Sequence, residues 1–279
     1  MKTVLITGAS SGFGEAVASH FADAGWNVVA TMRDPSMAGK QTRSFPNVLV
    51  TRLDVQDRRT IDAAIAEGIH RFDGIDVVIN NAGYGQFGIF EGVSPEAVQA
   101  QFDVNVFGAM DVVRAILPHF RSRRSGTVVN VSSGAGAIGF PMASVYSASK
   151  FALEGWSEAL SYELASIGIK VKIIEPGGAL KTNFMARVGG ESAAQQMISD
   201  YSQFLGHIGQ LYEGMGSIAD PDAVEKVVGA IFSAASDGSI QLRYAPTSDI
   251  QSLLNARRST SEQDFRAITL GMFMPPEPK

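Results

Sequence analysis

Thr7-Gly8-Ala9-Ser10-Ser11-Gly12-Phe13-Gly14 is the stretch that decides the fold of this chain. It follows an apolar, β-branched run over 3–7, which predicts a strand, and it opens an amphipathic stretch to Gly25, which predicts a helix. At such a turn, backbone N–H groups and a helix N-terminus can hold a pyrophosphate, provided that no Cβ blocks its approach. The spacing is Gly-x-x-x-Gly-x-Gly rather than the commoner Gly-x-Gly-x-x-Gly, and an ordinary strand–helix turn is the alternative. We expect Gly8, Gly12 and Gly14 to form a nucleotide-binding turn.

Short apolar runs alternate with longer amphipathic stretches along the rest of the chain. Strands are expected at 3–7, 27–31, 48–54, 76–80, 127–131, 170–175 and 240–244. Helices are expected at 12–25, 58–72, 94–124 with a break near Gly108, 144–167, and 224–235 with a cap at Asp220. This alternation predicts an α/β fold: a doubly wound, Rossmann-like parallel sheet of about seven strands, in three αβα layers.

The chain has 279 residues and no Pro/Gly/Ser linker long enough to separate two domains. We therefore expect a single domain over 1–279. The segment at about 179–217 is too long for an ordinary connection, which predicts a helical insertion that serves as a lid. Residues 246–279 form a C-terminal extension of unassigned role.

Composition excludes several classes of protein. With 45% hydrophobic and 18% charged residues, the chain can bury a core and is not disordered. The absence of cysteine rules out disulfides and thiol chemistry, and four scattered histidines do not predict a metal site. A net charge of −5 with dispersed Lys and Arg argues against nucleic acid as a partner. Because no apolar run reaches about 18 residues and no signal peptide is evident, we expect a cytoplasmic protein without a membrane partner.

Further motifs follow the glycine-rich turn in a fixed order. They are Asn80-Asn81-Ala82-Gly83 after the fourth strand, Asn105, Ser132-Ser133 after the fifth strand, Tyr146-x-x-x-Lys150, and Pro176-Gly177 after the sixth strand. In this order and spacing, the chain resembles the short-chain dehydrogenase/reductase family over about residues 1–182, and by element order to about 245. Within the family it is similar to the branch that contains steroid and retinol dehydrogenases and bacterial carbonyl reductases.

The resemblance implies an oxidoreductase that transfers a hydride between a nicotinamide cofactor and a carbonyl or secondary alcohol, with Asn105, Ser133, Tyr146 and Lys150 as its catalytic residues. Tyr146 and Lys150 are four apart and share a helix face, so the ammonium should lower the pKa of the phenol and suit it to general acid–base catalysis. Ser133 would bind the substrate oxygen, and Asn105 would hold a water linked to Lys150. Taken singly, these residues are more often a surface pair, a helix or turn cap and a surface polar residue; it is their combination with the glycine-rich turn that favours catalysis.

The end of the second strand bears on the choice of cofactor. Where proteins that prefer NAD place an acidic side chain, this chain has Met32, followed by Arg33, whose guanidinium suits a 2′-phosphate. NADP(H) is therefore expected rather than NAD(H), although a shift of two positions would restore an acid at Asp34.

The resemblance extends the cofactor-binding set to several other segments. The expected residues are Gly8, Ser10, Ser11, Gly12, Phe13, Gly14, Arg33, Asp54, Val55, Asn81, Ala82, Gly83, Tyr146, Lys150, Pro176, Gly177 and Thr182. Four residues, rather than the family's usual three, separate Pro176-Gly177 from Thr182, which weakens that last assignment.

Three segments are expected to wall the substrate site: 84–90, 134–142 and the insertion at 179–217. Their apolar side chains predict a bulky, apolar carbonyl or alcohol substrate, although the helical spacing from Met197 to Met215 also suits a helix packed on the core. The expected substrate-binding residues are Phe87, Phe90, Phe140, Met142, Met185 and Tyr201.

Two other functions share these features. A non-catalytic NADP-binding sensor or scaffold would have the same fold but would not need Tyr146. An epimerase or dehydratase of the same family would need a longer substrate domain than this chain offers. The resemblance also implies a homodimer or homotetramer, paired through the helices at 108–124 and 144–167.

Overall fold

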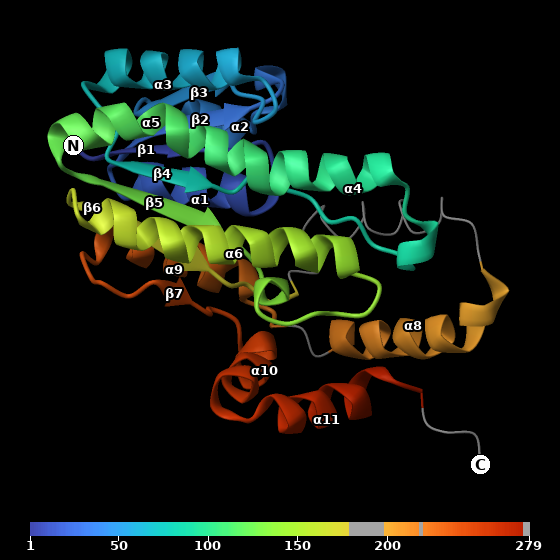
Figure 1. The fold of residues 1–279 in the computed structure, drawn as a ribbon. Helices are drawn as coiled ribbons and strands as arrows, with labels where there is room; N and C mark the ends of the chain where they lie inside the picture. The colour runs from blue at the N-terminus through green and yellow to red at the C-terminus, as the bar shows by residue number, and fades with distance from the viewer. Residues whose placement is uncertain (179–197, 218–219, 276–279) are drawn as a thin grey trace.

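The computed structural model describes residues 1–178, 198–217 and 220–275, and Figure 1 shows their arrangement. Seven strands form one sheet in the order β3-β2-β1-β4-β5-β6-β7, and every neighbouring pair is parallel. The strands are β1 (Thr3–Ile6), β2 (Asn27–Met32), β3 (Val48–Arg52), β4 (Val77–Asn80), β5 (Gly126–Val131), β6 (Ile169–Ile174) and β7 (Arg243–Tyr244). The predicted doubly wound parallel sheet is therefore confirmed.

Helices cover both faces of the sheet, which gives the three layers seen in Figure 1. The helices α1 (Gly12–Asp23) and α9 (Ala223–Ser236) pack their apolar side chains on one face. The helices α3 (Arg58–Phe72), α5 (Ala109–Arg123) and α6 (Ser144–Ala165) pack on the other. Because both faces are covered, the central strands are mostly apolar, and every residue of β1, β2 and β4 is buried.

The helix expected at 94–124 consists of three parts. Ser94 caps α4 (Pro95–Phe102), since its hydroxyl accepts the Ala97 N–H at 3.2 Å. A π-helical turn, η3 (Asp103–Gly108), separates α4 from α5 and is the expected break. The expected cap at Asp220 is wrong in detail: α9 starts after Asp222, and the Asp220 carboxylate accepts the Asp222 N–H at 3.1 Å.

Two helices beyond β7 were not predicted. These are α10 (Ser248–Ser259) and α11 (Glu262–Phe273), which Figure 1 shows below the sheet, beside the loop that follows β5. Ile250, Leu254 and Phe265 form a small core with Ile138 of that loop. The C-terminal extension therefore lies against a segment that was expected to wall the substrate site.

Part of the long insertion is helical, as its apolar spacing predicts. The helix α8 (Ser202–Ser217) follows the 3₁₀ turn η5 (Ser199–Tyr201), while 179–197 lie outside the described residues. Ile208 is fully buried, and the Tyr212 hydroxyl donates to the Pro141 carbonyl at 2.7 Å. The helix is thus held to the loop after β5.

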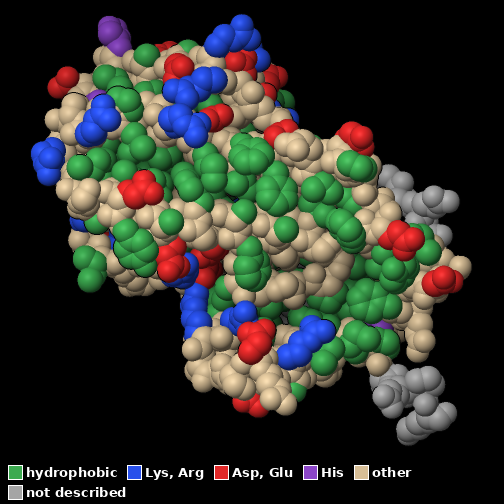
Figure 2. Space-filling view, viewed as in Figure 1, with side chains coloured by type: hydrophobic (Ala, Val, Ile, Leu, Met, Phe, Trp, Pro, Cys, Tyr) green, Lys and Arg blue, Asp and Glu red, His purple; other side chains and the backbone are tan. Residues whose placement is uncertain are grey.

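A short turn and a short helix, η1 (Pro35–Met37) and α2 (Lys40–Ser44), complete the connection between β2 and β3. Figure 2 shows hydrophobic side chains gathered across the face over α5 and the adjoining part of α4. Within the described ranges, none of the helices has the length and apolar character needed to cross a bilayer.

Candidate active site

The glycine-rich turn lies between β1 and α1 and is tied to the segment after β4. Gly8 has a φ of +69°, and a Cβ there would lie 2.9 Å from the Ala82 Cα. A Cβ on Gly14 would lie 2.2 Å from the Gly8 carbonyl oxygen, so neither position tolerates a side chain. The Asn81 amide donates to the carbonyls of Thr7 and Gly8 at 3.0 and 3.2 Å. Asn81 therefore fixes the turn at the carboxyl end of the central strands.

The start of α1 is suited to an anionic group. Ser11 is extended at the N-cap position and makes no side-chain capping bond, so the first N–H groups of α1 keep their capacity to bind an external acceptor. Together with the positive end of the helix dipole, these donors match a pyrophosphate. The residues present therefore fit a dinucleotide at this turn.

Ser133, Tyr146 and Lys150 come together at the carboxyl end of β5. Ser133 follows β5 directly, while Tyr146 and Lys150 lie on α6 and are 8% and 7% exposed. Ser133 lies close enough to the Tyr146 phenol to act on its pKa. The Lys150 Nζ donates to the Val131 carbonyl at 2.8 Å and lies 5.8 Å from the centre of the Tyr146 ring. A phenol, a hydroxyl and an amine thus share one buried site.

Burial sets the pKa of both groups on α6. Desolvation raises the pKa of Tyr146 to about 12, although Ser133 opposes the rise. Desolvation lowers the pKa of Lys150 to about 8, although the carboxylate of Glu154 opposes the fall. The expected lowering of the Tyr146 pKa by Lys150 is therefore wrong for this structure, because the cost of burying a phenolate outweighs the attraction of the nearby amine.

Asn105 lies in the π-helical turn η3 and is 2% exposed. Its amide nitrogen donates to the Tyr84 carbonyl at 2.9 Å and to the Ser149 hydroxyl at 3.2 Å, and its oxygen accepts the Tyr84 N–H at 3.1 Å. Because Ser149 lies on α6, the side chain of Asn105 joins the loop after β4 to the helix that carries Tyr146. Its expected water link to Lys150 stays a prediction.

The end of β2 places three candidate cofactor residues in different surroundings. Met32 is the last residue of the strand and is 2% exposed, while Arg33 follows it on the surface. The Asp34 carboxylate accepts the Ser36 N–H at 2.9 Å and caps η1. Arg33 is thus the first exposed side chain after β2. The Asp34 carboxylate already accepts a hydrogen bond from its own turn.

The other expected cofactor residues lie at strand ends. Asp54 and Val55 follow β3, and the Val55 side chain packs so closely on Gly108 that a Cβ there would lie 2.7 Å away. Pro176 and Gly177 follow β6, where the Gly177 N–H donates to the Thr247 hydroxyl at 2.8 Å. Thr182 lies outside the described residues.

Some of the expected substrate residues surround Tyr146 and others do not. The Phe87 ring stacks on the Tyr146 ring at 5.5 Å, and Phe140 packs on the same cluster. Met142 lies in the adjoining loop with a φ of +57°. Phe90, by contrast, is 64% exposed in η2 (Phe90–Gly92).

Tyr201 contacts the neighbouring residue of η2, since its hydroxyl donates to Glu91 Oε2 at 3.2 Å. Met185 is outside the described residues. Sequence reasoning missed Phe273, whose ring lies 5.9 Å from that of Phe140, because nothing linked the C-terminal extension to the site.

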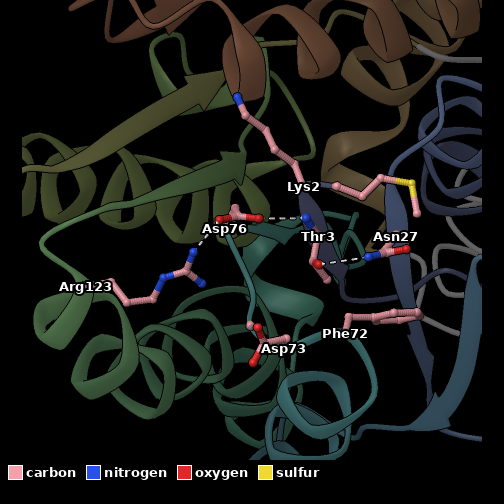
Figure 3. Close-up of a pocket in the computed structure, with 9 residues that line it drawn as sticks. Lys2, Thr3, Asn27, Phe72, Asp73, Asp76 and Arg123 are labelled. Carbon is pink, nitrogen blue, oxygen red and sulfur yellow. Dashed lines mark hydrogen bonds and ion pairs between the residues drawn. The ribbon is translucent and has the colours of Figure 1, made fainter.

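An open recess lies at the other end of the sheet (Figure 3). It is formed at the amino ends of β1 and β4, where Asp76 accepts the Thr3 N–H at 2.8 Å and pairs with Arg123 at 3.0 Å. None of the expected site residues lines it. Ligands of doubly wound sheets bind at the carboxyl ends of the strands, so this recess is separate from the candidate active site.

The fold and the glycine-rich turn define a dinucleotide-binding α/β protein of the Rossmann type. A family model described as short chain dehydrogenase matches residues 2–193. The chain belongs to the short-chain dehydrogenase family. An uncharacterized oxidoreductase of Schizosaccharomyces pombe is 40% identical over 219 residues, which cover 78% of this chain and 89% of that protein. Retinol dehydrogenase 8 of Bos taurus is 40% identical over 186 residues, which cover 63% of this chain and 58% of that protein.

Solved structures agree with this assignment. A short-chain dehydrogenase from Streptomyces avermitilis matches with a TM-score of 0.80 and 36% identity, covering 97% of this chain and 94% of that one. The closed form of a serine dehydrogenase complexed with NADP+ matches with a TM-score of 0.65 and 30% identity, covering 68% and 78%. The chain is therefore an oxidoreductase of this family, with a nicotinamide cofactor.

Proposed function

We propose that the protein is an NADP(H)-dependent carbonyl reductase or alcohol dehydrogenase in which Tyr146 is the general acid and base. The observation that carries the proposal is the burial of the Tyr146 phenol and the Lys150 amine on one face of α6, beside Ser133 at the carboxyl end of β5. A nucleotide-binding sensor with the same fold would need only the glycine-rich turn, and not this second, buried site.

The chain's own residues supply the proton chemistry. The cofactor, when bound at the glycine-rich turn, supplies or accepts the hydride. With a pKa of about 12, the phenol of Tyr146 carries its proton at neutral pH, which suits donation to the alkoxide that forms as a carbonyl is reduced. Ser133 binds the same substrate oxygen, and Lys150 provides a positive charge next to the phenol.

The preference for NADP(H) rests on the end of β2. Met32 stands where the family's acidic residue would bind a ribose 2′-hydroxyl, but it is buried and has no polar group to offer. Arg33, the next residue, is exposed. A guanidinium can bind a 2′-phosphate through two hydrogen bonds. Asp34 is the alternative acid, but its carboxylate already accepts the Ser36 N–H.

The substrate class follows from the side chains around Tyr146. Phe87 and Phe140 line the phenol, and Met142 adjoins them, so the carbonyl's neighbours in a bound substrate must be apolar and of some bulk. The similarity to retinol dehydrogenase 8 supports a substrate of this type. Met185 and Tyr201 complete the proposed set on the side of the insertion.

We further propose that 1–279 form one catalytic domain in the cytoplasm, with the insertion at about 179–217 as a lid and 246–279 as an extension. Large hydrophobic side chains stay exposed along η3 and α6: Phe107 is 47%, Phe151 43% and Tyr162 71% exposed. An apolar surface of this kind supports pairing of identical chains through α5 and α6, as a homodimer or homotetramer.

Replacement of Tyr146 by phenylalanine tests the function. Tyr146→Phe keeps the ring that stacks on Phe87 but removes the hydroxyl, so we expect turnover of ketones with NADPH to fall by about 10²–10⁴-fold. NADPH binding, followed by nicotinamide fluorescence, should stay close to that of the wild type. The measurement uses a panel of apolar ketones and alcohols with NADPH, NADP, NADH and NAD, read by nicotinamide absorbance.

Tyr162→Phe is the matched control. Tyr162 lies on the same helix but is 71% exposed, and its hydroxyl lies 3.5 Å from Glu158, so this variant should turn over at the wild-type rate. Full turnover in Tyr146→Phe would reject the role of Tyr146. Binding of NADPH without turnover of any member of the panel would favour the sensor.

A further inference from the structure

Five charged side chains gather behind the candidate active site and form what we call the charge array. Its members are Glu154 and Glu158 on α6, Glu175 after β6, Arg243 on β7 and Arg258 on α10. Arg243 binds Glu154 at 2.9 Å and Glu158 at 2.5 Å, and it lies 3.8 Å from Glu175. Arg258 binds both carboxylate oxygens of Glu175. The array thus joins the catalytic helix to β6, β7 and the C-terminal extension.

Two of these carboxylates are buried, so their charges need compensation. Glu175 is fully buried and Glu154 is 5% exposed, whereas Glu158 has a side chain that is 44% exposed. A buried carboxylate without a charged partner would take up a proton or destabilise the fold. Arg258 supplies the charged partner of Glu175. Arg243 is therefore left to bind Glu154.

Close packing brings Glu154 against the loop that carries Ser133. A Cβ on Gly136 would lie 2.8 Å from the Glu154 Cγ and 3.1 Å from its Oε1, and 2.5 Å from the Ser132 Oγ. One carboxylate oxygen of Glu154 therefore binds Arg243, while the other lies against Gly136 and next to Ser132, the residue before Ser133.

Glu154 is also one helical turn beyond Lys150, on the same face of α6. The Lys150 amine is buried, and the Val131 carbonyl accepts one of its hydrogen bonds. A buried amine keeps its proton only if a negative charge offsets the loss of water. Glu154 is the acidic side chain that opposes the effect of burial on the Lys150 pKa.

We propose that Glu154 is a positioning residue for Lys150: its carboxylate keeps the buried amine charged, and Arg243 holds that carboxylate in place. The inference rests on the proposed function insofar as Lys150 serves catalysis. Its consequence is that α10, through Arg258 and Glu175, helps to set the charge next to the reacting groups.

Several polar and charged groups surround Glu154 and Lys150, and they are consistent with a carboxylate that keeps the amine charged. They are Tyr146 and Glu158 on α6, Ser132 after β5, Glu175 after β6, Arg243 on β7 and Arg258 on α10. Burial, and then the charge of Glu175, raise the pKa of Glu154, while Arg243 opposes the rise. Arg258 pairs with Glu175, and so limits the repulsion that Glu154 experiences.

Titration of Lys150 tests the proposal without requiring turnover. In protein labelled with ¹³C-lysine, the Lys150 side-chain signal is assigned from its loss in Lys150→Arg and followed against pH. In the wild type we expect a midpoint near pH 8, and in Glu154→Gln a midpoint lower by about one pH unit. At pH 8 the charged fraction would then fall from about one half to about one tenth, so kcat should fall about five-fold.

Glu158→Gln is the matched control, because Glu158 also binds Arg243 but its side chain is 44% exposed and lies a further turn from Lys150. Its Lys150 midpoint should equal that of the wild type. Equal midpoints in Glu154→Gln and Glu158→Gln would overturn the proposal.

The wild type offers a second readout should Glu154→Gln fail to fold. As Glu154 takes up a proton above its ordinary range, the Lys150 signal should show a separate step at acid pH. A curve with the amine step alone would reject the coupling. If the wild type turned over no substrate, but its Lys150 signal titrated as expected, the proposed function would be rejected. The role of Glu154 in keeping Lys150 charged would still stand.

Discussion

Tyr146 and Lys150 illustrate how one environment moves two titratable groups toward their neutral forms. Both lie on the buried face of α6, where the pKa of the phenol is raised to about 12 and that of the amine is lowered to about 8. Their spacing of four residues can be read from the sequence, but the direction in which the Tyr146 pKa moves cannot. It depends on how completely Phe87, Phe140 and Ala143 exclude water from the phenol.

At the same scale, we expect Arg33 to set the proposed preference for NADP(H) over NAD(H). Arg33→Ala removes an exposed guanidinium at the end of β2, so the Kd for NADPH should rise by about 10–100-fold while that for NADH changes less than about three-fold. Fluorescence titration with each cofactor measures both values. Arg52→Ala, an exposed arginine at the end of β3, serves as the control. Equal weakening of both cofactors by Arg33→Ala would contradict the assignment.

Among the elements, α10 contributes to both stability and the site. Arg258 neutralises Glu175, which is fully buried, so Arg258→Gln leaves that carboxylate with Arg243 at 3.8 Å as its remaining charged partner. We expect the free energy of unfolding, measured in urea, to fall by about 2–4 kcal/mol.

The adjacent Arg257→Gln is the control for this loss. Arg257 pairs with the exposed Glu262 and lies over the Phe265 ring, contacts that are together worth about 1 kcal/mol or less. Equal losses in the two variants would mean that the burial of Glu175 is not what makes Arg258 important.

The turn between α9 and β7 carries a pH-dependent contribution to stability. Burial disfavours the Asp237 carboxylate, but hydrogen bonds from Tyr244 and Ser239 outweigh it and lower its pKa to about 2. Because the folded pKa lies below the unfolded value, this contribution is present above about pH 4 and is lost as the pH falls toward 2.

Asp237→Asn should therefore lower the free energy of unfolding by about 1 kcal/mol at pH 7 and make its dependence on pH flatter below 4. Thermal unfolding between pH 2 and 7 measures the difference. Glu67→Gln, at an exposed position of α3, should leave the profile of the wild type unchanged. Parallel profiles for wild type and Asp237→Asn would contradict the assignment.

For the whole molecule, the exposed side chains of Phe107 on η3 and of Phe151 and Tyr162 on α6 predict self-association. Phe151→Glu places a charge on a residue that is 43% exposed and should leave the monomer folded. Sedimentation should give a multiple of 29.6 kDa for the wild type and a shift toward 29.6 kDa for the variant. A monomeric wild type at micromolar concentration would reject the predicted pairing.

The sequence by itself determined the layered sheet, the glycine-rich turn and the pairing of Tyr146 with Lys150. These features depend on spacing along the chain: apolar runs of strand length, glycines at a strand–helix turn, and residues four apart on one helix. The break near Gly108 was also legible, although its π-helical form was not.

Only the tertiary structure decided where α10 and α11 lie, which acids are buried, and in which direction the pKa of Tyr146 moves. Arg243 binds Glu154 across 89 positions of sequence, and Arg258 binds Glu175 across 83, so no local pattern connects them. Such contacts exist because the sheet brings β6, β7 and α6 together. Burial then sets the charge of each group, and burial is a property of the packed molecule rather than of any segment.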